Sequence, residues 1–590
     1  MDGGHALLII CAPSSMNTFR GSFYLGLPEP DRMSAVQNES WGTRVGLILA
    51  MAGNAVGLGN FLRFPVQAVN NGGGAFIIPY LVCFLLMGIP LLWIEWSMGR
   101  FGGRNGNHST PFILDTMTKR AFWKYFGVFG IFTNIAVAAY YCYIESWTMS
   151  YVWHSIVGTF DGLSQTQVAA FFTSYVDIGH STTGIPYEAV VFYVLCLGLN
   201  TWILSRGLAG VEKAAKIGMP LLILFGVFLA LRGLTLGTTG ASEEVPTASA
   251  WDGLNFLWTP QFESLSNPKV WLAAAGQIFF TLSVGMGTIH CYAAYVKSKD
   301  DIALNAVSAG FTNEFVEVVL GSLIVIPIAA GYLGLDWVKE NAGFGMAFQT
   351  MPFLFEKWGP FLSAMAGVMW FGLLFFAGIT SSLAMGTPWM GFMRDEFGWG
   401  RIKGALSFGL IVLVLGLPTV IFFQEGVFDE YDYWAGTVAL VVFALAETIL
   451  FSWVFGIDRG WKELLSGSDL RVPTAYKFII KYITPLLLLL VFLGALFTPQ
   501  GNEWTAAFQS LFSGGGWTLD NSSIIKTIAN AGLHEQLAAA TDPAEMTRLQ
   551  DRLFYTNFAR VILTLTFAGL ALLVYVAALR RIQNTTSTAA

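Results

Sequence analysis

The sequence predicts an all-α integral membrane protein with twelve transmembrane helices, two of which are broken at mid-membrane. Its 590 residues are 54% hydrophobic and only 12% charged, whereas about a quarter of the residues in a soluble domain are charged. Apolar runs close to the ~20 residues that span a bilayer recur along the chain, and glycines interrupt two of these runs near their middle. We therefore expect most of the surface to face lipid.

Twelve segments are apolar and long enough to be candidate spans. They are residues 43–66, 74–99, 122–155, 187–204, 210–233, 268–297, 302–333, 360–393, 402–423, 431–456, 473–498 and 554–580. Because their number is even, we expect both termini on the same side of the membrane.

Positively charged residues indicate which side that is. Arg100, Arg104 and Arg120 follow the second span, and Arg580 and Arg581 follow the twelfth. The loop between the third and fourth spans, in contrast, contains no Lys or Arg. Since short loops rich in Lys and Arg stay in the cytoplasm, the pattern predicts cytoplasmic termini in a multi-pass protein of the inner or plasma membrane.

The spans divide the chain into four regions. We interpret residues 1–40 as a disordered tail or a mis-annotated start, and 41–498 as the core with the first eleven helices. Residues 499–553 are polar, and we interpret them as an extracellular insert. The twelfth helix and a cytoplasmic tail are expected in residues 554–590.

Composition and motifs argue against two other classes of protein. The net charge of −6 argues against a nucleic-acid partner, which requires a basic surface. The chain has no HExxH or GxSxG motif and no acid pair placed for hydrolysis, so we do not expect an enzyme. The five cysteines lack the spacing of metal ligands.

Two spans are interrupted at mid-membrane. The first reads AMAGNAVGLGNFLRFP over residues 50–65, and the sixth reads GQIFFTLSVGMG over residues 276–287. Interruptions five spans apart predict an inverted repeat, spans 1–5 against spans 6–10, with a binding site at the two breaks. Glycines that merely allow close helix packing are the alternative.

Broken helices suit a site for an anion and a cation together. Unwound backbone is costly in hydrocarbon unless it lines a cavity. Helix N-termini at a break offer N–H groups to an anion, while carbonyl groups and helix C-termini attract a cation. The two breaks can therefore hold a carboxylate and Na⁺ side by side.

Six motifs in this chain are long and specific, namely GNAVGLGNFLRFP at 53–65, NGGGAFIIPY at 71–80, YYCYIESW at 140–147, GQIFFTLSVGMG at 276–287, FAGITSS at 376–382 and DYWAG at 432–436. Together they resemble the neurotransmitter:sodium symporter family, and its bacterial amino-acid transporters most closely. The resemblance extends from about residue 41 to 498 and implies a leucine-transporter-like fold with a 5+5 inverted repeat.

The resemblance also implies a function. A family member of this kind is a sodium-coupled symporter that imports a neutral, apolar or aromatic, L-amino acid by alternating access. The alternative is a transport-inactive amino-acid sensor on the same fold, because fold alone does not fix function. The expected partners are the amino acid, sodium ions and the lipid membrane, and a homodimer is a possible assembly.

Two sodium sites follow from the resemblance, each built from oxygen atoms, which a hard cation prefers. The first takes a substrate carboxylate oxygen and oxygen atoms of Ala55, Asn60, Thr281 and Asn313. The second takes the carbonyl groups of Gly53, Val56 and Ala377 and the hydroxyl groups of Thr380 and Ser381.

Glu317 is expected to replace a chloride ion. Relatives that need chloride carry a small hydroxyl residue at this position, and their halide site matches Tyr80, Gln277, Thr281 and Asn313 here. A carboxylate within the membrane is a functional candidate, and it would supply the negative charge itself. A structural role in a hydrogen-bond network is the alternative.

The substrate pocket implied by the resemblance is uncharged. Backbone N–H groups near Gly57 and Gly59, with the Tyr141 hydroxyl, would hold the carboxylate, and Ala55, Phe280, Thr281 and Ser283 would hold the amino group. The subsite for the substrate side chain comprises Val137, Tyr141, Phe280, Met286, Ser381 and Met385. Amine-carrying relatives place Asp where this chain has Gly57, so the pocket favours amino acids.

Gates are expected on both sides of this pocket. Arg63 and Asp432 match an extracellular ion pair, and Trp41, Tyr295 and Asp395 match the cytoplasmic gate. The family's cytoplasmic Arg is replaced by Asn38, which removes the expected partner of Asp395. Arg32 and Arg44 are candidates to take its place.

Overall fold

Almost all of the chain that the structure describes is α-helical, as predicted. The structure is a computed structural model, and it describes residues 39–118, 120–177, 187–242, 245–343 and 345–589. Within these ranges the one isolated β-bridge joins Pro499 and Leu519. Residues Ser40–Ala590 form one compact unit. Asn38 and Arg32 lie outside the described residues.

Each predicted span corresponds to one or more helical elements. In chain order these elements are α1 (Arg44–Ala55), α2 (Gly59–Leu62) and α3 (Phe64–Asn70); α4 (Gly74–Cys83), η2 (Phe84–Gly88) and α5 (Ile89–Arg104); α7 (Phe122–Phe126) and α8 (Phe129–Val157); α10 (Tyr187–Leu204); α11 (Leu208–Leu236); α13 (Pro268–Leu282) and α14 (Thr288–Ala293); α15 (Ile302–Glu314), η4 (Phe315–Gly321) and α16 (Ser322–Leu333); α20 (Pro360–Phe397); α21 (Arg401–Ile421); α22 (Val427–Tyr433), η5 (Trp434–Val438), α23 (Ala439–Ile449), η6 (Leu450–Gly456) and α24 (Ile457–Leu464); α25 (Ala475–Phe478), η7 (Ile479–Ile483) and α26 (Thr484–Leu496); and α30 (Pro543–Ala589).

Shorter elements connect the spans. They are α6 (Thr110–Thr116), α9 (Gln165–Val176), α12 (Ala250–Trp258), η3 (Phe262–Ser266), α17 (Leu335–Asn341), α18 (Met346–Gln349), α19 (Met351–Glu356), η8 (Gln500–Asn502), α27 (Trp504–Phe512), α28 (Ile524–Ile528) and α29 (Ala531–Ala539).

Nine helices in the described part of the chain are long and apolar enough to cross a membrane, and a tenth span is the bent pair of α1 with α2 and α3. α10 is shorter, and α13 with α14 is interrupted. The protein is therefore a multi-pass membrane protein, and the count of twelve stays a prediction.

Capping side chains explain where several helices begin. The side-chain oxygen of Thr43 accepts a hydrogen bond from the Gly46 N–H at 3.0 Å at the start of α1. Asp301 caps α15 in the same way through the Leu304 N–H at 2.8 Å. Such side chains satisfy backbone N–H groups that have no partner within the helix.

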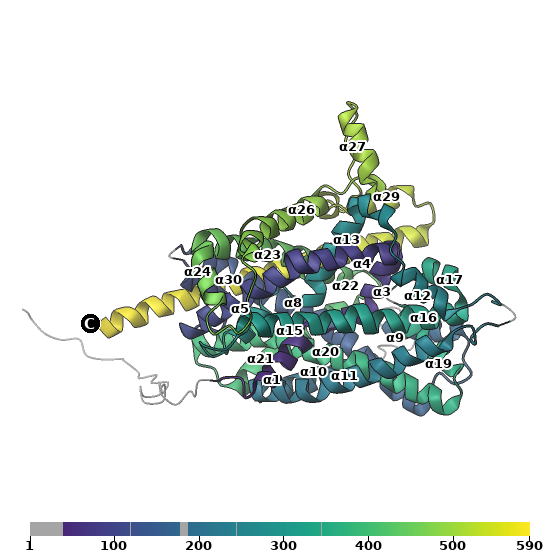
Figure 1. The fold of residues 1–590 in the computed structure, drawn as a ribbon, viewed down its shortest axis with the longest axis horizontal. Coiled ribbons are helices and arrows are strands. Elements are labelled where there is room, and N and C mark those ends of the chain that lie inside the picture. The colour runs from purple at the N-terminus through teal and green to yellow at the C-terminus, as the bar shows by residue number, and fades with distance from the viewer. Residues whose placement is uncertain (1–38, 119, 178–186, 243–244, 344, 590) are drawn as a thin grey trace, which may run out of the picture. The chain divides into compact units, whose positions relative to one another are not determined.

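The last helix begins earlier than the hydropathy of the sequence predicts. α30 starts at Pro543, whereas the apolar run begins near residue 554. Residues 543–553 carry charged side chains, so they form a helical extension that no apolar run marks. Within the insert, α27 projects away from the bundle (Figure 1).

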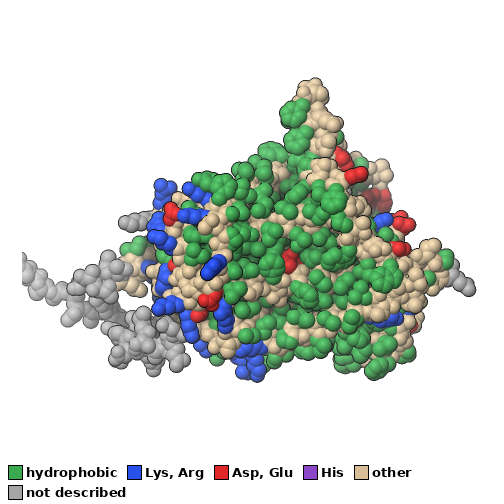
Figure 2. All heavy atoms as spheres, viewed as in Figure 1, with side chains coloured by type: hydrophobic (Ala, Val, Ile, Leu, Met, Phe, Trp, Pro, Cys, Tyr) green, Lys and Arg blue, Asp and Glu red, His purple; other side chains and the backbone are tan. Residues whose placement is uncertain are grey.

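The surface agrees with a membrane location. Hydrophobic side chains cover a broad band across the middle of the face in Figure 2. Lys and Arg side chains gather at the end where α24 and the end of α30 lie (Figures 1 and 2). α8 and α20 pack against each other in the interior, and α8 is buried over most of its length.

Candidate functional site

The first span is broken between α1 and α2, as predicted. α1 ends at Ala55 and the helix resumes at Gly59, with a bend of 46° across the break. A Cβ atom on Gly57 would lie 2.8 Å from the Tyr141 hydroxyl, and one on Gly59 would lie 2.3 Å from a ring carbon of Phe280. Glycine is therefore needed because the unwound backbone lies directly against side chains of α8 and α13.

The sixth span is broken between α13 and α14. After Leu282 the backbone takes positive φ angles at Ser283 (53°), Gly285 (72°) and Gly287 (91°), a region that glycine enters at little cost. The Ser283 hydroxyl donates a hydrogen bond to the Asn54 carbonyl oxygen at 2.9 Å. The two breaks are thus in direct contact.

A cavity lies where the two breaks meet. Every residue predicted to bind substrate lines it, namely Ala55, Gly57, Gly59, Val137, Tyr141, Phe280, Thr281, Ser283, Met286, Ser381 and Met385. The lining also includes Asn60 and three residues that sequence reasoning missed, Tyr140, Gly436 and Leu440. Tyr140 precedes Tyr141 in the YYCYIESW motif, and Gly436 ends the DYWAG motif. None of the lining side chains is charged.

The cavity is narrow in this structure. About 30 Å³ of it is open to the centre of a water-sized molecule, which is room for about one or two waters. The Gly57 N–H donates to the Asn60 side-chain oxygen at 2.9 Å, and the Leu58 N–H donates to the Tyr141 hydroxyl at 3.0 Å. A bound carboxylate would have to replace these hydrogen bonds and widen the cavity.

Three of the residues predicted for the first sodium site form one hydrogen-bonded group. The Asn60 amide nitrogen lies 2.9 Å from the Asn313 amide oxygen and 3.3 Å from the Thr281 hydroxyl. The Asn313 amide nitrogen donates to the same hydroxyl at 2.9 Å. Since the Asn60 oxygen faces the Gly57 N–H instead, the Asn60 amide would have to turn to present its oxygen to a cation.

The residues predicted for the second sodium site meet between α1 and α20. The Ser381 hydroxyl oxygen lies 3.2 Å from the carbonyl oxygens of both Gly53 and Ala377, and 3.3 Å from that of Asn54. A hydroxyl has one hydrogen to donate, so the Ser381 hydroxyl can donate to only one of these three carbonyl oxygens, and lone pairs of the others are directed to the same place. A Cβ on Gly53 would lie 2.9 Å from Thr380, so the Thr380 side chain also lies at this contact between α1 and α20.

Glu317 is fully buried behind the first predicted sodium site. Its carboxylate accepts hydrogen bonds from the Tyr80 hydroxyl at 2.6 Å and from the side chains of Gln277 and Thr281. Asn313 joins this group through its bond to Thr281. The four residues expected around Glu317 are thus gathered there, and Thr281 links the carboxylate to Asn60 and Asn313, which are predicted to bind sodium.

The predicted extracellular ion pair is not formed in this structure. The Arg63 guanidinium lies over the Phe280 ring, 4.4 Å from its centroid. Asp432 instead accepts a hydrogen bond from the Tyr140 hydroxyl at 2.6 Å. Both residues flank the cavity, because Phe280 and Tyr140 belong to its lining.

Asp395, which was predicted for the cytoplasmic gate, has partners that the sequence did not indicate. It accepts hydrogen bonds from the His108 backbone N–H at 2.8 Å and from the Arg394 guanidinium at 2.9 Å. Arg44 is therefore not its partner, since Arg44 donates to Asn305 at 3.0 Å. The other candidate, Arg32, lies outside the described residues and stays a prediction, and His108 is too distant in the sequence for any spacing to have indicated it.

The two aromatic residues of the predicted cytoplasmic gate lie at the segment that follows the second break. Tyr295 stacks on the His108 ring with 4.6 Å between centroids. The Trp41 indole N–H donates to the Tyr292 carbonyl oxygen at 3.0 Å. Both aromatic residues thus contact or belong to the segment that follows the second break.

Comparisons with known proteins identify the family. The model of the sodium:neurotransmitter symporter family matches residues 38–167 and 163–534. An uncharacterized sodium-dependent transporter of Methanocaldococcus jannaschii is 32% identical over 475 residues, which is 78% of this chain and 92% of that protein. The sodium-dependent nutrient amino acid transporter 1 of Drosophila melanogaster is 24% identical over 524 residues, covering 82% of this chain and 81% of that protein.

A solved structure agrees with these matches. The crystal structure of MhsT in complex with L-phenylalanine has a TM-score of 0.67 and 28% sequence identity, and the match covers 77% of this chain and 99% of MhsT. The leucine-transporter-like fold implied by the motifs is therefore confirmed. This chain belongs to the sodium:neurotransmitter symporter family, whose members are sodium-coupled transporters rather than enzymes.

Proposed function

We propose that this protein is a symporter that couples the entry of sodium to the uptake of a neutral, apolar or aromatic, L-amino acid by alternating access. The observation that carries this proposal is the cavity at the meeting point of the two breaks, with oxygen-rich groups on two of its sides. Such a site can hold the carboxylate of the substrate next to the cation that drives its transport.

The lining favours a neutral substrate. A charged substrate side chain would lose its hydration among uncharged residues and gain no partner, which is costly. Gly57 has no side chain that could occupy the cavity. An acidic side chain at that position would instead favour a substrate with a positively charged amine and no carboxylate. Met286 and Met385 border the cavity, and because their side chains are flexible they can adapt to apolar or aromatic groups.

Two relatives support an amino acid as the substrate class. The Drosophila protein is described as a nutrient amino acid transporter, and MhsT was solved with L-phenylalanine. Both match this chain over more than three quarters of its length. We assign the aromatic or apolar preference to this chain by the uncharged cavity lining together with these two relatives.

Two sodium ions are proposed to bind, one at each oxygen-rich group. The first uses Ala55, Asn60, Thr281 and Asn313 with the substrate carboxylate, and the second uses Gly53, Val56, Ala377, Thr380 and Ser381. Because the substrate is itself a ligand of the first ion, each raises the affinity for the other. The second ion meets only neutral ligands, so a membrane potential drives it inward at ~2.3 kcal/mol per charge per 100 mV.

The remaining predictions belong to the same proposal. Glu317 is proposed to make transport independent of chloride, because its carboxylate already supplies a negative charge beside Thr281. Arg63 and Asp432 are proposed to close the outer side, and Trp41, Tyr295 and Asp395 the cytoplasmic side. The protein is proposed to lie in the inner or plasma membrane with both termini in the cytoplasm.

Uptake into proteoliposomes tests the proposal directly. The purified protein is reconstituted, and labelled amino acids are supplied with an imposed sodium gradient or with choline in place of sodium. We expect sodium-dependent accumulation of neutral amino acids. Binding of the same amino acids without accumulation would instead support the transport-inactive sensor.

A further inference from the structure

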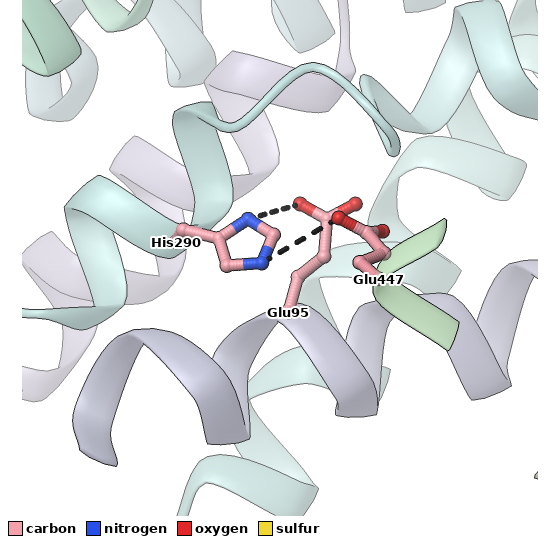
Figure 3. Close-up of side chains that lie close together, drawn as sticks. All are labelled: Glu95, His290 and Glu447. Carbon is pink, nitrogen blue, oxygen red and sulfur yellow. Dashed lines mark ion pairs between the residues drawn. The ribbon is translucent and has the colours of Figure 1, made fainter. Parts of the chain in front are cut away.

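A buried cluster of three ionisable side chains lies beside the second break, outside the cavity. Glu95 comes from α5, His290 from α14 and Glu447 from α23, and each is fully buried. His290 Nδ1 lies 3.3 Å from a Glu95 oxygen, and Nε2 lies 3.5 Å from a Glu447 oxygen. Figure 3 shows both carboxyl groups on the same side of the imidazole ring. Three distant parts of the sequence therefore converge on one point.

These groups do not satisfy one another's hydrogen bonding. One Glu95 oxygen accepts a hydrogen bond from the Gly285 N–H at 2.6 Å. The other Glu95 oxygen, both Glu447 oxygens and both His290 nitrogens have no hydrogen-bond partner among the described residues. Buried polar atoms are nearly always paired, so five unpaired atoms that face one another indicate that a shared partner is missing.

The charge of the cluster indicates a cation. With both carboxyl groups ionised and the imidazole neutral, the cluster carries two negative charges, and unpaired charges are costly to bury. Within the described ranges, the ion pairs of Glu95 and Glu447 are with His290, and no Lys or Arg joins them. One divalent cation would neutralise the cluster.

The donor atoms select the kind of cation. Mg²⁺ and Ca²⁺ prefer oxygen ligands alone, whereas an imidazole nitrogen with carboxylate oxygens suits Zn²⁺ and related transition metals. One His290 nitrogen, the free Glu95 oxygen and one Glu447 oxygen offer three donors, and a water molecule would complete a tetrahedral zinc site. The hydrogen bond from Gly285 would orient Glu95, as outer groups do around bound metals.

The spacing is close to what one ion requires. One donor atom from each residue lies within 4.8 Å of the other two. Donor atoms bound at ~2.0–2.2 Å from one tetrahedral zinc ion lie about 3.3–3.6 Å apart, so the side chains would have to move together by about 1 Å. Small rotations of the three side chains are therefore sufficient to bring their donor atoms around a single ion.

We propose that Glu95, His290 and Glu447 bind one divalent transition-metal cation of the Zn²⁺ type. The ion ties α14, the second half of the broken sixth span, to α5 and α23. Gly285, which anchors Glu95, lies inside the break itself. Occupancy is therefore expected to hold the break in one conformation and to slow any movement that transport requires.

Metal content measured on the full-length protein tests this proposal without reference to transport. The protein is purified in detergent, treated with a chelator and dialysed against Zn²⁺ alone or Co²⁺ alone. We expect one tightly bound ion per chain, and for Co²⁺ the visible absorption of a tetrahedral site. We also expect Zn²⁺ to raise the melting temperature of the wild-type protein.

Variants then assign the site. His290→Leu and Glu447→Gln should lose the bound ion and the rise in melting temperature. His154→Ala is the matched control, because His154 pairs with a single carboxylate, Glu188, at 2.6 Å and should leave the stoichiometry unchanged. A wild-type protein that binds neither ion would show that protons neutralise the cluster and would overturn the proposal. Retention of the ion in both variants would overturn it as well.

Discussion

Tyr140 donates its hydroxyl hydrogen to Asp432 at 2.6 Å, which ties α22 to the middle of α8 beside the cavity. The Asp432 carboxylate, which was predicted to pair with Arg63, is therefore bound by a cavity-lining residue. Arg63 meanwhile rests on Phe280, another lining residue. Both members of the proposed outer gate thus contact the site that they are expected to cover.

Removal of the Tyr140 hydroxyl should weaken the outer closure. Tyr140→Phe deletes a hydrogen bond to a carboxylate, a bond worth about 1.5–3 kcal/mol, or at least roughly tenfold in a rate. We expect faster release of bound amino acid, measured as dissociation of a labelled substrate from purified protein. Tyr151→Phe is the control, because the Tyr151 hydroxyl has no hydrogen-bond partner in the part described. Equal dissociation rates in the two variants would contradict this role.

The second prediction concerns the sodium sites. Asn60→Ala and Thr380→Ala each remove an oxygen atom from a proposed site, so both should raise the sodium concentration needed for half-maximal uptake. Loss of one partner of a buried polar group costs about 1–3 kcal/mol, so we expect a change of roughly tenfold or more. Uptake measured against sodium concentration is the readout.

Thr387→Ala is the matched control for these sodium variants. Thr387 follows Thr380 by two turns on α20, and its hydroxyl is directed to the Leu383 carbonyl oxygen in its own helix, at 3.5 Å. It should leave the sodium requirement unchanged. A sodium requirement that stays at the wild-type value in both Asn60→Ala and Thr380→Ala would refute the ligand assignment.

The third prediction concerns chloride. Glu317→Ser removes the carboxylate that accepts hydrogen bonds from Tyr80, Gln277 and Thr281. These donors would then face an empty space that a chloride ion can fill, so uptake by the variant should require chloride. The measurement is uptake in chloride and in gluconate, with Glu314→Gln as a neighbouring control. Chloride-dependent uptake by the wild-type protein would make this interpretation wrong.

The sequence predicted well those features that depend on local pattern. Glycines at 57, 59, 285 and 287 marked both breaks. A Cβ at 57 or 59 would collide with a neighbouring side chain, and glycine adopts the positive φ angles at 285 and 287 at little cost. The resemblance then indicated every lining residue except Tyr140, Gly436 and Leu440, although Tyr140 and Gly436 belong to two of the motifs. The start of α30 was missed, since its first turns are polar and carry no hydropathy signal.

Features that depend on which charged groups the fold brings together were not predicted. His108 and Asp395 are 287 positions apart, so no spacing rule could join them, and Arg44 was an equally reasonable candidate. Glu95, His290 and Glu447 come from three separate helices for the same reason. An ion pair between Arg63 and Asp432 depends on the conformation of the gate, which a sequence does not specify.

The last prediction concerns substrate size. Met286 lines the cavity, and its carbonyl oxygen accepts hydrogen bonds from Thr133 at 3.0 Å and Asn134 at 2.7 Å. These bonds fix the backbone, so a substitution should change the side chain alone. Met286→Phe places a rigid ring where a flexible chain stood, and the cavity is already narrow.

Large substrates should lose most from this change. A methylene more or less in an apolar pocket shifts discrimination by about 1–3 kcal/mol, or roughly 10–200-fold, so Trp should lose affinity most. Ala should change little, because its side chain does not reach this wall. The test is competition by Ala, Leu, Met, Phe and Trp against one labelled substrate, with Met369→Phe, outside the cavity, as the control. A uniform loss across all five would mean that Met286 serves packing and does not select the substrate.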